Sequence, residues 1–332
     1  MMKKTILTAL GCLILASVFP ATAYAQELIV GGQAVGIRIQ TEGVLVSGVA
    51  QVETEDGGFS PAAEAGLKEG DCILRVDGKE VRSAAELIGA VGSAGGDPVE
   101  LTVRRGERLW KFFVQPVRSE EGQWMMGMWL RDAVTGIGTV TFCDPDSGTY
   151  GALGHSITDE VSGKTVPLET GSITEAEIHS ITPGTAGTPG ALNGDFVGGQ
   201  VMGSVERNSD CGIYGVISGT LDGRMAEVGE FRTGPATILA TVNGREVREF
   251  SVRITRIYRD GEGEHVMLSV TDEELRAMTG GIVQGMSGSP ILQDGRLVGA
   301  VTHVFVNDPT RGYGISIQDM LAAAGIAESQ AA

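Results

Sequence analysis

The chemistry most visible in this sequence lies near its end, where Val283 to Pro290 read VQGMSGSP. Glycine and serine are residues of tight turns, because glycine adopts positive φ and serine bonds to nearby backbone. Flanking glycines also let a substrate carbonyl approach a serine hydroxyl and the amides of Gly285 and Ser287. With 50 glycines in 332 residues, the string alone leaves two alternatives open, a flexible turn and a catalytic Ser287.

A serine hydroxyl is a weak nucleophile and needs a general base, usually a histidine oriented by a carboxylate. The chain has four histidines. His155 ends GALGH, where small residues leave the ring open to a cleft, and is the favoured base. His303, in AVTHVFVND, directly follows the strand after the serine and is the rival. His179 alternates with apolar residues, which indicates structure, and His265 lies beside a charged turn, which indicates a solvated ring.

The elements that must position these residues are short strands. From about Met125 onward, alternating runs such as GIGTVTFCDPDSGTYGALGH, REVREFSVRITRIYR and SGSPILQDGRLVGAVTHVF dominate. Many short strands with glycine-rich turns predict a sandwich or barrel. A helix around residues 317–324 is expected to cap this β-rich domain.

The region from about Gly31 to Val117 has a different pattern, in which strands alternate with two short helices. SPAAEAG has the serine, proline and glycine that begin and end a short helix. DCILRVDGKEV reads as a strand followed by an Asp-Gly turn. SAAELIGAV has a capping box and predicts a longer helix whose apolar face carries Leu87, Ile88 and Val91.

This order, and especially SPAAEAGLKEGDCILRVDGKEV, resembles a PDZ domain of the kind attached to bacterial proteases. In that family a peptide adds as an extra strand beside the second strand, against the longer helix. The resemblance implies that AVGI is the carboxylate-binding loop, with the amides of Val35, Gly36 and Ile37 around a chain terminus. A β-rich module without a ligand is the alternative.

The first residues read as an export signal. Lys3 and Lys4 precede an apolar run, and Ala23-Tyr24-Ala25 supplies the small–x–small pattern of a signal peptidase site. We expect cleavage after Ala25. An uncleaved membrane anchor is the alternative, because the run is near the lower limit for spanning a bilayer.

Charge and cysteine content restrict the partners. The leader carries two lysines and no acid, so its removal moves the formal net charge from −17 to −19. Such a protein repels phosphate backbones, which argues against nucleic acid as a partner. The remaining cysteines, Cys72, Cys143 and Cys211, form no CxxC pair, so zinc-ligand spacing is absent. We therefore expect no metal and no cofactor.

Four segments carry a second resemblance: GALGH, NGDFVGGQVMGSVERNSDCGIYG, RTGPATILATVNG and TGGIVQGMSGSPILQDGRLVGAVTHVFVNDPTRGYGISIQDML. They are similar to the stage IV sporulation protein B family, exported serine peptidases with a PDZ domain before a chymotrypsin-like peptidase domain. The resemblance implies Ser287 as nucleophile, His155 as base and Asp272 as acid. The amides of Gly285 and Ser287 would form the oxyanion hole.

The acid is the least determined member of this set. Asp272 lies only 15 positions before Ser287, much closer than the orienting carboxylate in most chymotrypsin-like chains. Asp159 and Asp195 remain alternatives at this point.

The same resemblance implies a signalling role. Family members cleave themselves and then cut the regulatory subunit that restrains an intramembrane metalloprotease, which activates a late mother-cell sigma factor. The protein would lie between the forespore membranes, free or held by its N-terminal segment. The PDZ ligand would be its own chain or a membrane partner.

We therefore expect a mainly β chain with a PDZ domain and a chymotrypsin-like β-barrel serine peptidase domain. The expected boundaries are 1–25 for the leader, 30–118 for the PDZ domain, 119–127 for a linker and 128–326 for the peptidase. The alternatives are a PDZ adaptor with an inactive peptidase shell and a quality-control protease, which would have the opposite domain order. A metal hydrolase is disfavoured, because no two histidines have ligand spacing.

Overall fold

The computed structural model describes residues 26–159, 163–261 and 263–326. The expected leader, residues 1–25, lies outside these ranges. Within them, no helix is both long enough and apolar enough to cross a membrane.

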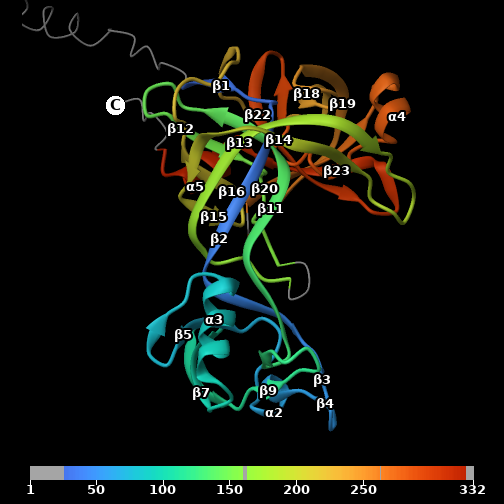
Figure 1. Ribbon diagram of the computed structural model, residues 1–332. Helices are drawn as coiled ribbons and strands as arrows, with labels where there is room; N and C mark the ends of the chain where they lie inside the picture. Colours follow the sequence, from blue (N-terminus) through green and yellow to red (C-terminus); the bar gives the residue numbers. More distant parts are fainter. Residues whose placement is uncertain (1–25, 160–162, 262, 327–332) are drawn as a thin grey trace, which may run out of the picture.

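A small domain fills the lower part of Figure 1. Its apolar core includes Ile73, Leu87, Val91 and Leu101, all buried. The longer helix begins as expected, because the Ser83 side chain accepts a hydrogen bond from the Glu86 amide. The elements of this domain are β3 (Val52–Thr54), β4 (Gly57–Phe59), α2 (Pro61–Glu64), β5 (Cys72–Val76), β6 (Lys79–Glu80), α3 (Ala84–Ala94), β7 (Val99–Arg105), β8 (Arg108–Val114), β9 (Val117–Arg118) and β10 (Trp124–Met125).

Two strands of 16 residues each, β2 (Ala34–Val49) and β11 (Met128–Cys143), run from this domain into the larger one above it (Figure 1). The end of β2 pairs with β5 in the small domain, whereas its beginning pairs with β11 and β13 (Leu168–Thr182). The small domain is therefore inserted into a barrel of the larger domain. The expected boundaries at 30–118 and 128–326 divide that barrel, because β2 continues through both domains without a break.

This arrangement corrects the expected carboxylate-binding loop. Val35, Gly36 and Ile37 lie inside β2, buried between two neighbouring strands. Gly36 packs so closely against Phe196 that an added Cβ would lie 2.2 Å from the Phe196 ring. The glycine accommodates the partly exposed ring of Phe196 against β2, so its presence in AVGI does not mark a ligand loop.

The first barrel joins β2 and β11 to strands on both sides. β13 pairs with β14, and a bridge between Gly203 and Ile217 brings the end of β14 to the residue after β16. β16 pairs with β12, and β12 pairs with β11, so the sheet returns to its start. The remaining elements are β1 (Glu27–Val30), β12 (Thr149–Ala152), β14 (Ala191–Val205), β15 (Arg207–Ser209), β16 (Gly212–Val216) and β17 (Met225–Glu227).

The second barrel is closed in the order β18-β19-β20-β23-β22-β21. The helix expected at residues 317–324 is α5, and the Ser316 side chain caps it by accepting from the Asp319 amide. The elements are β18 (Gly234–Thr241), β19 (Val247–Asp260), β20 (Gly263–Val270), α4 (Glu273–Thr279), β21 (Pro290–Gln293), β22 (Arg296–Phe305), β23 (Asp308–Ser316) and α5 (Ile317–Ala324). The expectation of a mainly β chain with a barrel-type domain is confirmed.

Candidate active site

The serine loop lies between α4 and β21, on the second barrel, and its backbone requires glycine. Gly285 has φ +98° and Gly288 has φ +93°, both in the left-handed region. A Cβ on Gly288 would lie 2.0 Å from the Thr139 carbonyl oxygen, so the loop touches β11 of the first barrel. Between these glycines, the Ser287 hydroxyl donates a hydrogen bond of 2.7 Å to the carbonyl oxygen of Thr302.

His155 comes from the first barrel, three residues after the end of β12. The chain turns sharply before it, because Leu153 and Gly154 have φ +69° and +71°. A positive φ is strained for leucine, and such strain is typical of functional sites. The His155 Nδ1 lies 2.8 Å from the carbonyl oxygen of Ser156. A carbonyl only accepts, so Nδ1 carries the hydrogen and Nε2 is free to act as a base.

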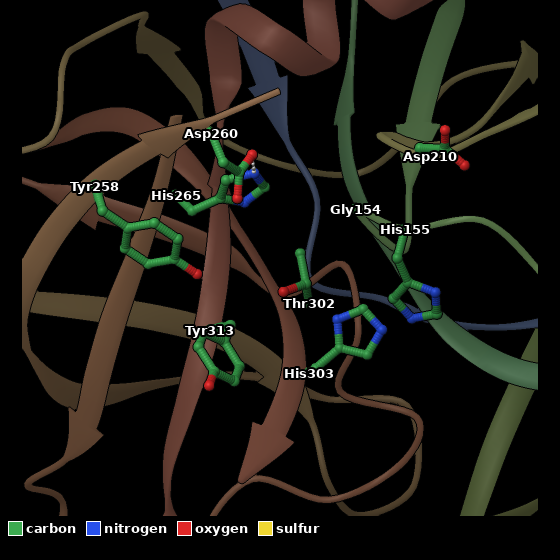
Figure 2. A pocket seen from close by; sticks show the side chains of 9 residues that line it. All are labelled: Gly154, His155, Asp210, Tyr258, Asp260, His265, Thr302, His303 and Tyr313. Carbon is green, nitrogen blue, oxygen red and sulfur yellow. Dashed lines mark hydrogen bonds and ion pairs between the residues drawn. The ribbon is translucent and has the colours of Figure 1, made fainter. Parts of the chain in front are cut away.

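The two barrels bring Ser287 and His155 to the same cavity, of about 1040 Å³. A second cavity of about 320 Å³ adjoins it, and His155, Asp210, Thr302 and His303 line both. Figure 2 shows the His155 and His303 rings side by side in the smaller cavity. Within the described ranges, no group of three or more histidine, cysteine or acidic side chains could hold a metal ion.

His303, the rival base, is a neighbour of His155. The two ring centroids lie 4.5 Å apart, with 34° between the ring planes. Burial lowers the pKa of His155, and its hydrogen bond to Ser156 offsets part of that effect. Desolvation and the neighbouring His155 lower the pKa of His303, although part of its side chain stays exposed. Both rings are therefore neutral at pH 7, which is the state that a general base requires.

Asp272 lies at neither cavity and has another role. Its carboxylate accepts hydrogen bonds from the amides of Leu275, at 2.9 Å, and Ser251, at 3.2 Å. It is the N-cap of α4, which satisfies an amide that the helix itself leaves unpaired. The structure thus gives the expected triad acid a capping function. Its spacing from Ser287 reflects the length of α4 and the serine loop.

The other two acidic candidates lie in different surroundings. Asp195 pairs with His179 at 3.2 Å, between β14 and β13. Asp159 is buried at the wall of the larger cavity. Asp210, which sequence reasoning did not consider, lines both cavities from the turn between β15 and β16. Among the described residues, no carboxylate forms an ion pair or hydrogen bond with the His155 ring.

The expected oxyanion hole is consistent with the loop geometry. In the part of the chain that the structure describes, neither the Gly285 amide nor the Ser287 amide donates a hydrogen bond to another residue. Their carbonyl groups point elsewhere, to Thr139 on β11. Thr139 and Thr302 were missed in the sequence because their contacts join segments that lie far apart along the chain.

In the small domain, the three predicted peptide-binding residues on α3 differ in their exposure. Leu87 and Val91 are buried in the core, whereas Ile88 is 61% exposed. The N-terminus of α3 is tied to β11 by a hydrogen bond of 2.9 Å from the Ala84 amide to the Asp132 carboxylate. The first residues of β11 pair with β2 along one edge and have no strand partner along the other in the described structure. The open edge beside α3 is where a peptide strand could add.

The comparisons with known proteins give a family profile for each of the two domains. A PDZ domain profile matches residues 59–105, and the profile of SpoIVB peptidase S55 matches residues 122–321. The PDZ domain of an SdrC-like protein from Listeria monocytogenes is 27% identical and covers 28% of this chain and 93% of its own, with a TM-score of 0.24. The Rv3671c protease of M. tuberculosis is 14% identical over 58% of this chain and 75% of its own, with a TM-score of 0.36.

A curated relative from Clostridium perfringens, named as a zinc metalloprotease, is 35% identical over 69 residues. This chain spans only about a fifth of that protein's length (21%), and the match covers 21% of this chain. The peptidase profile, by contrast, covers more than half of this chain, from β10 to α5, including both barrels' catalytic candidates. This chain therefore belongs to the SpoIVB peptidase S55 family, with a PDZ domain inserted in its first barrel.

Proposed function

We propose that this protein is a serine endopeptidase in which Ser287 is the nucleophile and His155 is the general base. The observation that carries the proposal is their meeting at one cavity from two different barrels. The His155 tautomer leaves Nε2 unprotonated, and two backbone amides beside Ser287 are unpaired within the described chain. These are the base, the nucleophile and the oxyanion donors that acyl transfer needs.

The resting hydrogen bond defines the first step. The Ser287 hydroxyl must leave the Thr302 carbonyl oxygen and donate to His155 instead. His155 then takes the proton as Ser287 attacks the substrate carbonyl, and the amides of Gly285 and Ser287 hold the oxyanion. His155 next gives the proton to the leaving amine. The Ser156 carbonyl keeps the His155 ring in the correct tautomer throughout.

The wall of the larger cavity suggests the kind of peptide that is cut. Part of that wall is apolar, with Leu192, Ile282, Val283, Val304 and Val306. An apolar side chain next to the scissile bond would bury its surface against these residues. We expect short peptides with leucine at this position to be cleaved faster than matched peptides with lysine or glutamate.

The biological role is proposed from family membership. We propose that the protein is exported, acts between the forespore membranes, cleaves itself and cuts the regulatory subunit of an intramembrane metalloprotease. This cut would lead to activation of a late mother-cell sigma factor. The membership of the SpoIVB peptidase family and the PDZ domain support this role. The PDZ ligand, from its own chain or a membrane partner, would add to the open edge of β11 beside α3.

The test is active-site labelling of the purified protein with a fluorophosphonate, followed by peptide mapping. The label should appear on the peptide that contains Ser287 and disappear in Ser287→Ala. Ser289→Ala is the matched control, because the Ser289 hydroxyl is buried and makes no hydrogen bond with any residue that the structure describes. It should keep the label. No label on the wild-type protein, with peptide binding intact, would favour a PDZ adaptor with an inactive peptidase shell.

A further inference from the structure

The residues of the serine loop that flank its oxyanion amides are held to β11 of the first barrel by one residue, Thr139. The Thr139 amide donates to the Ser287 carbonyl oxygen at 2.9 Å. Its hydroxyl donates to the Gly285 carbonyl oxygen at 2.8 Å. One side chain and its own backbone thus hold the carbonyl groups of both residues whose amides would form the oxyanion hole.

The environment of Thr139 makes these bonds hard to replace. Its exposed fraction is 1%, so bulk water has no access to supply a substitute donor. The carbonyl of Gly285 and the amide of Met286 share one peptide plane, and the Met286 amide donates to Val283 at 3.1 Å. Gly285 has no side chain to oppose rotation of that plane. The Thr139 hydroxyl and the Val283 carbonyl are therefore the two contacts that keep it in place.

We propose that Thr139 is a positioning residue, which keeps the Gly285 and Ser287 amides directed at the substrate carbonyl. The proposal rests on the proposed peptidase function. If the Gly285 carbonyl lost its donor, the Gly285–Met286 peptide plane could rotate, and the amides of Gly285 and Ser287 on either side of that plane would lose their fixed direction. The transition state would lose stabilisation, whereas binding of the ground-state peptide would change little.

The chain offers a closely matched control two residues further along the same strand. The Thr141 hydroxyl donates to the Gly288 carbonyl oxygen at 2.8 Å. Thr141 is also fully buried. It therefore repeats the burial and the bond length of Thr139, but it holds the glycine after the nucleophile and not an oxyanion residue. Equal losses of stability are expected from replacing either hydroxyl.

The experiment compares Thr139→Val, Thr139→Ser and Thr141→Val on a short peptide substrate. Valine keeps the shape of threonine and removes the donor, whereas serine keeps the donor. Thr139→Val should lower kcat by about 10- to 100-fold, less than direct loss of an oxyanion donor, with KM within about twofold. Thr139→Ser should stay within about threefold of the wild-type kcat, and so should Thr141→Val, despite a comparable drop in Tm.

Equal kcat values for Thr139→Val and Thr141→Val would overturn the proposal and leave Thr139 as a structural residue. If Thr139→Val does not fold, Thr139→Cys makes the same comparison with a weaker donor. A crystal structure of Thr139→Val would show the conformation of the serine loop independently of catalytic activity. The Gly285 carbonyl should be rotated away from β11, and an unchanged loop would contradict the proposal. Absence of Ser287 labelling in the wild type would instead refute the peptidase function itself.

Discussion

The two barrels contribute to the site in different ways. The second barrel is continuous in sequence, from β18 to β23, and presents Ser287 on a loop between two of its own elements. The first barrel is interrupted by the PDZ domain, and its strands β2 and β11 meet across that insertion. It presents His155 after a strained turn at Leu153. The nucleophile thus depends on local sequence, whereas the base depends on pairing between distant segments.

The difference explains why the site lies at the junction. Neither barrel alone contains both the base and the nucleophile, and the Thr139 and Thr141 hydrogen bonds join the two across the loop. β11 also forms an edge of the PDZ domain, so one strand reaches from the proposed peptide-binding edge to the serine loop. Substitutions in each barrel therefore test whether the active site depends on both barrels.

The largest expected effect comes from removing the base that the first barrel supplies. His155→Ala should lower kcat/KM by about 10⁴-fold or more, because loss of one catalytic group disables the proton transfer. The Tm should change little relative to this loss, since His155 lies at a cavity wall. Steady-state kinetics with a short peptide measures the effect. His265→Ala, in the smaller cavity but paired with Asp260 at 3.1 Å, is the control and should retain activity.

The comparison of the barrels also shows what the sequence could predict. Ser287 and His155 lie in short motifs whose small residues are needed locally, so their roles could be proposed from the motifs. The surroundings of Gly36 and Asp272 could not be predicted, because their partners are distant or of another kind. Gly36 meets Phe196, 160 positions away, and Asp272 meets the backbone of its own helix. A motif gives the residue type, but it does not give the strand that packs against it.

A second prediction concerns the first barrel where the PDZ insertion begins. Gly36→Glu should lower the free energy of unfolding by about 1–3 kcal/mol, because its Cβ would overlap the Phe196 ring and force that ring aside. Thermal unfolding should show a drop in Tm, and activity should fall with it. Gly89→Glu, on the open face of α3 with no atom near its Cβ, is the control and should be neutral or stabilising. An unchanged Tm for Gly36→Glu would contradict the prediction that close packing against Phe196 requires a glycine at this position.

The third prediction uses the contact between the barrels at His155 and His303. Burial lowers the pKa of His155 below its ordinary value of 6.5. A base must be neutral, so kcat/KM should be lost on acidification only below pH 6.5. His303→Ala should admit water to the ring, raise the pKa and move the acidic limb up towards 6.5, with a loss of about tenfold or less.

His303→Phe separates the ring contact from other effects of His303. A phenyl ring keeps the ring contact with His155 and excludes water from it. The acidic limb of the pH–rate profile should therefore stay at its wild-type position. The other ionisable groups that line the smaller cavity are Asp210, Tyr258, Asp260, His265 and Tyr313, and the larger cavity adds Arg131 and Asp159 (Figure 2). All of them stay the same in both variants. Identical pH profiles for alanine, phenylalanine and wild type would show that His303 does not shield the base.

The smallest effect is expected at Asp272, the carboxylate of the second barrel. Asp272→Asn keeps an oxygen that can accept from the Leu275 amide, and asparagine is as good an N-cap as aspartate. It loses the acceptor for the Ser251 amide, so the Tm should fall slightly, by the equivalent of about 1 kcal/mol. If Asp272 caps α4, kcat/KM on a short peptide should remain within about threefold of wild type. If Asp272 oriented His155, the same change would lower the rate by about 10⁴-fold, because the amide would favour the wrong tautomer.

Asp272→Ala distinguishes the two roles further. If Asp272 is a cap, this variant should lower the Tm more than Asp272→Asn does, and the acidic limb of its pH–rate profile should stay at the wild-type position. If Asp272→Asn lowered kcat/KM several thousand-fold with an unchanged Tm, Asp272 would be a catalytic residue. That role would require a conformation in which its carboxylate no longer caps α4.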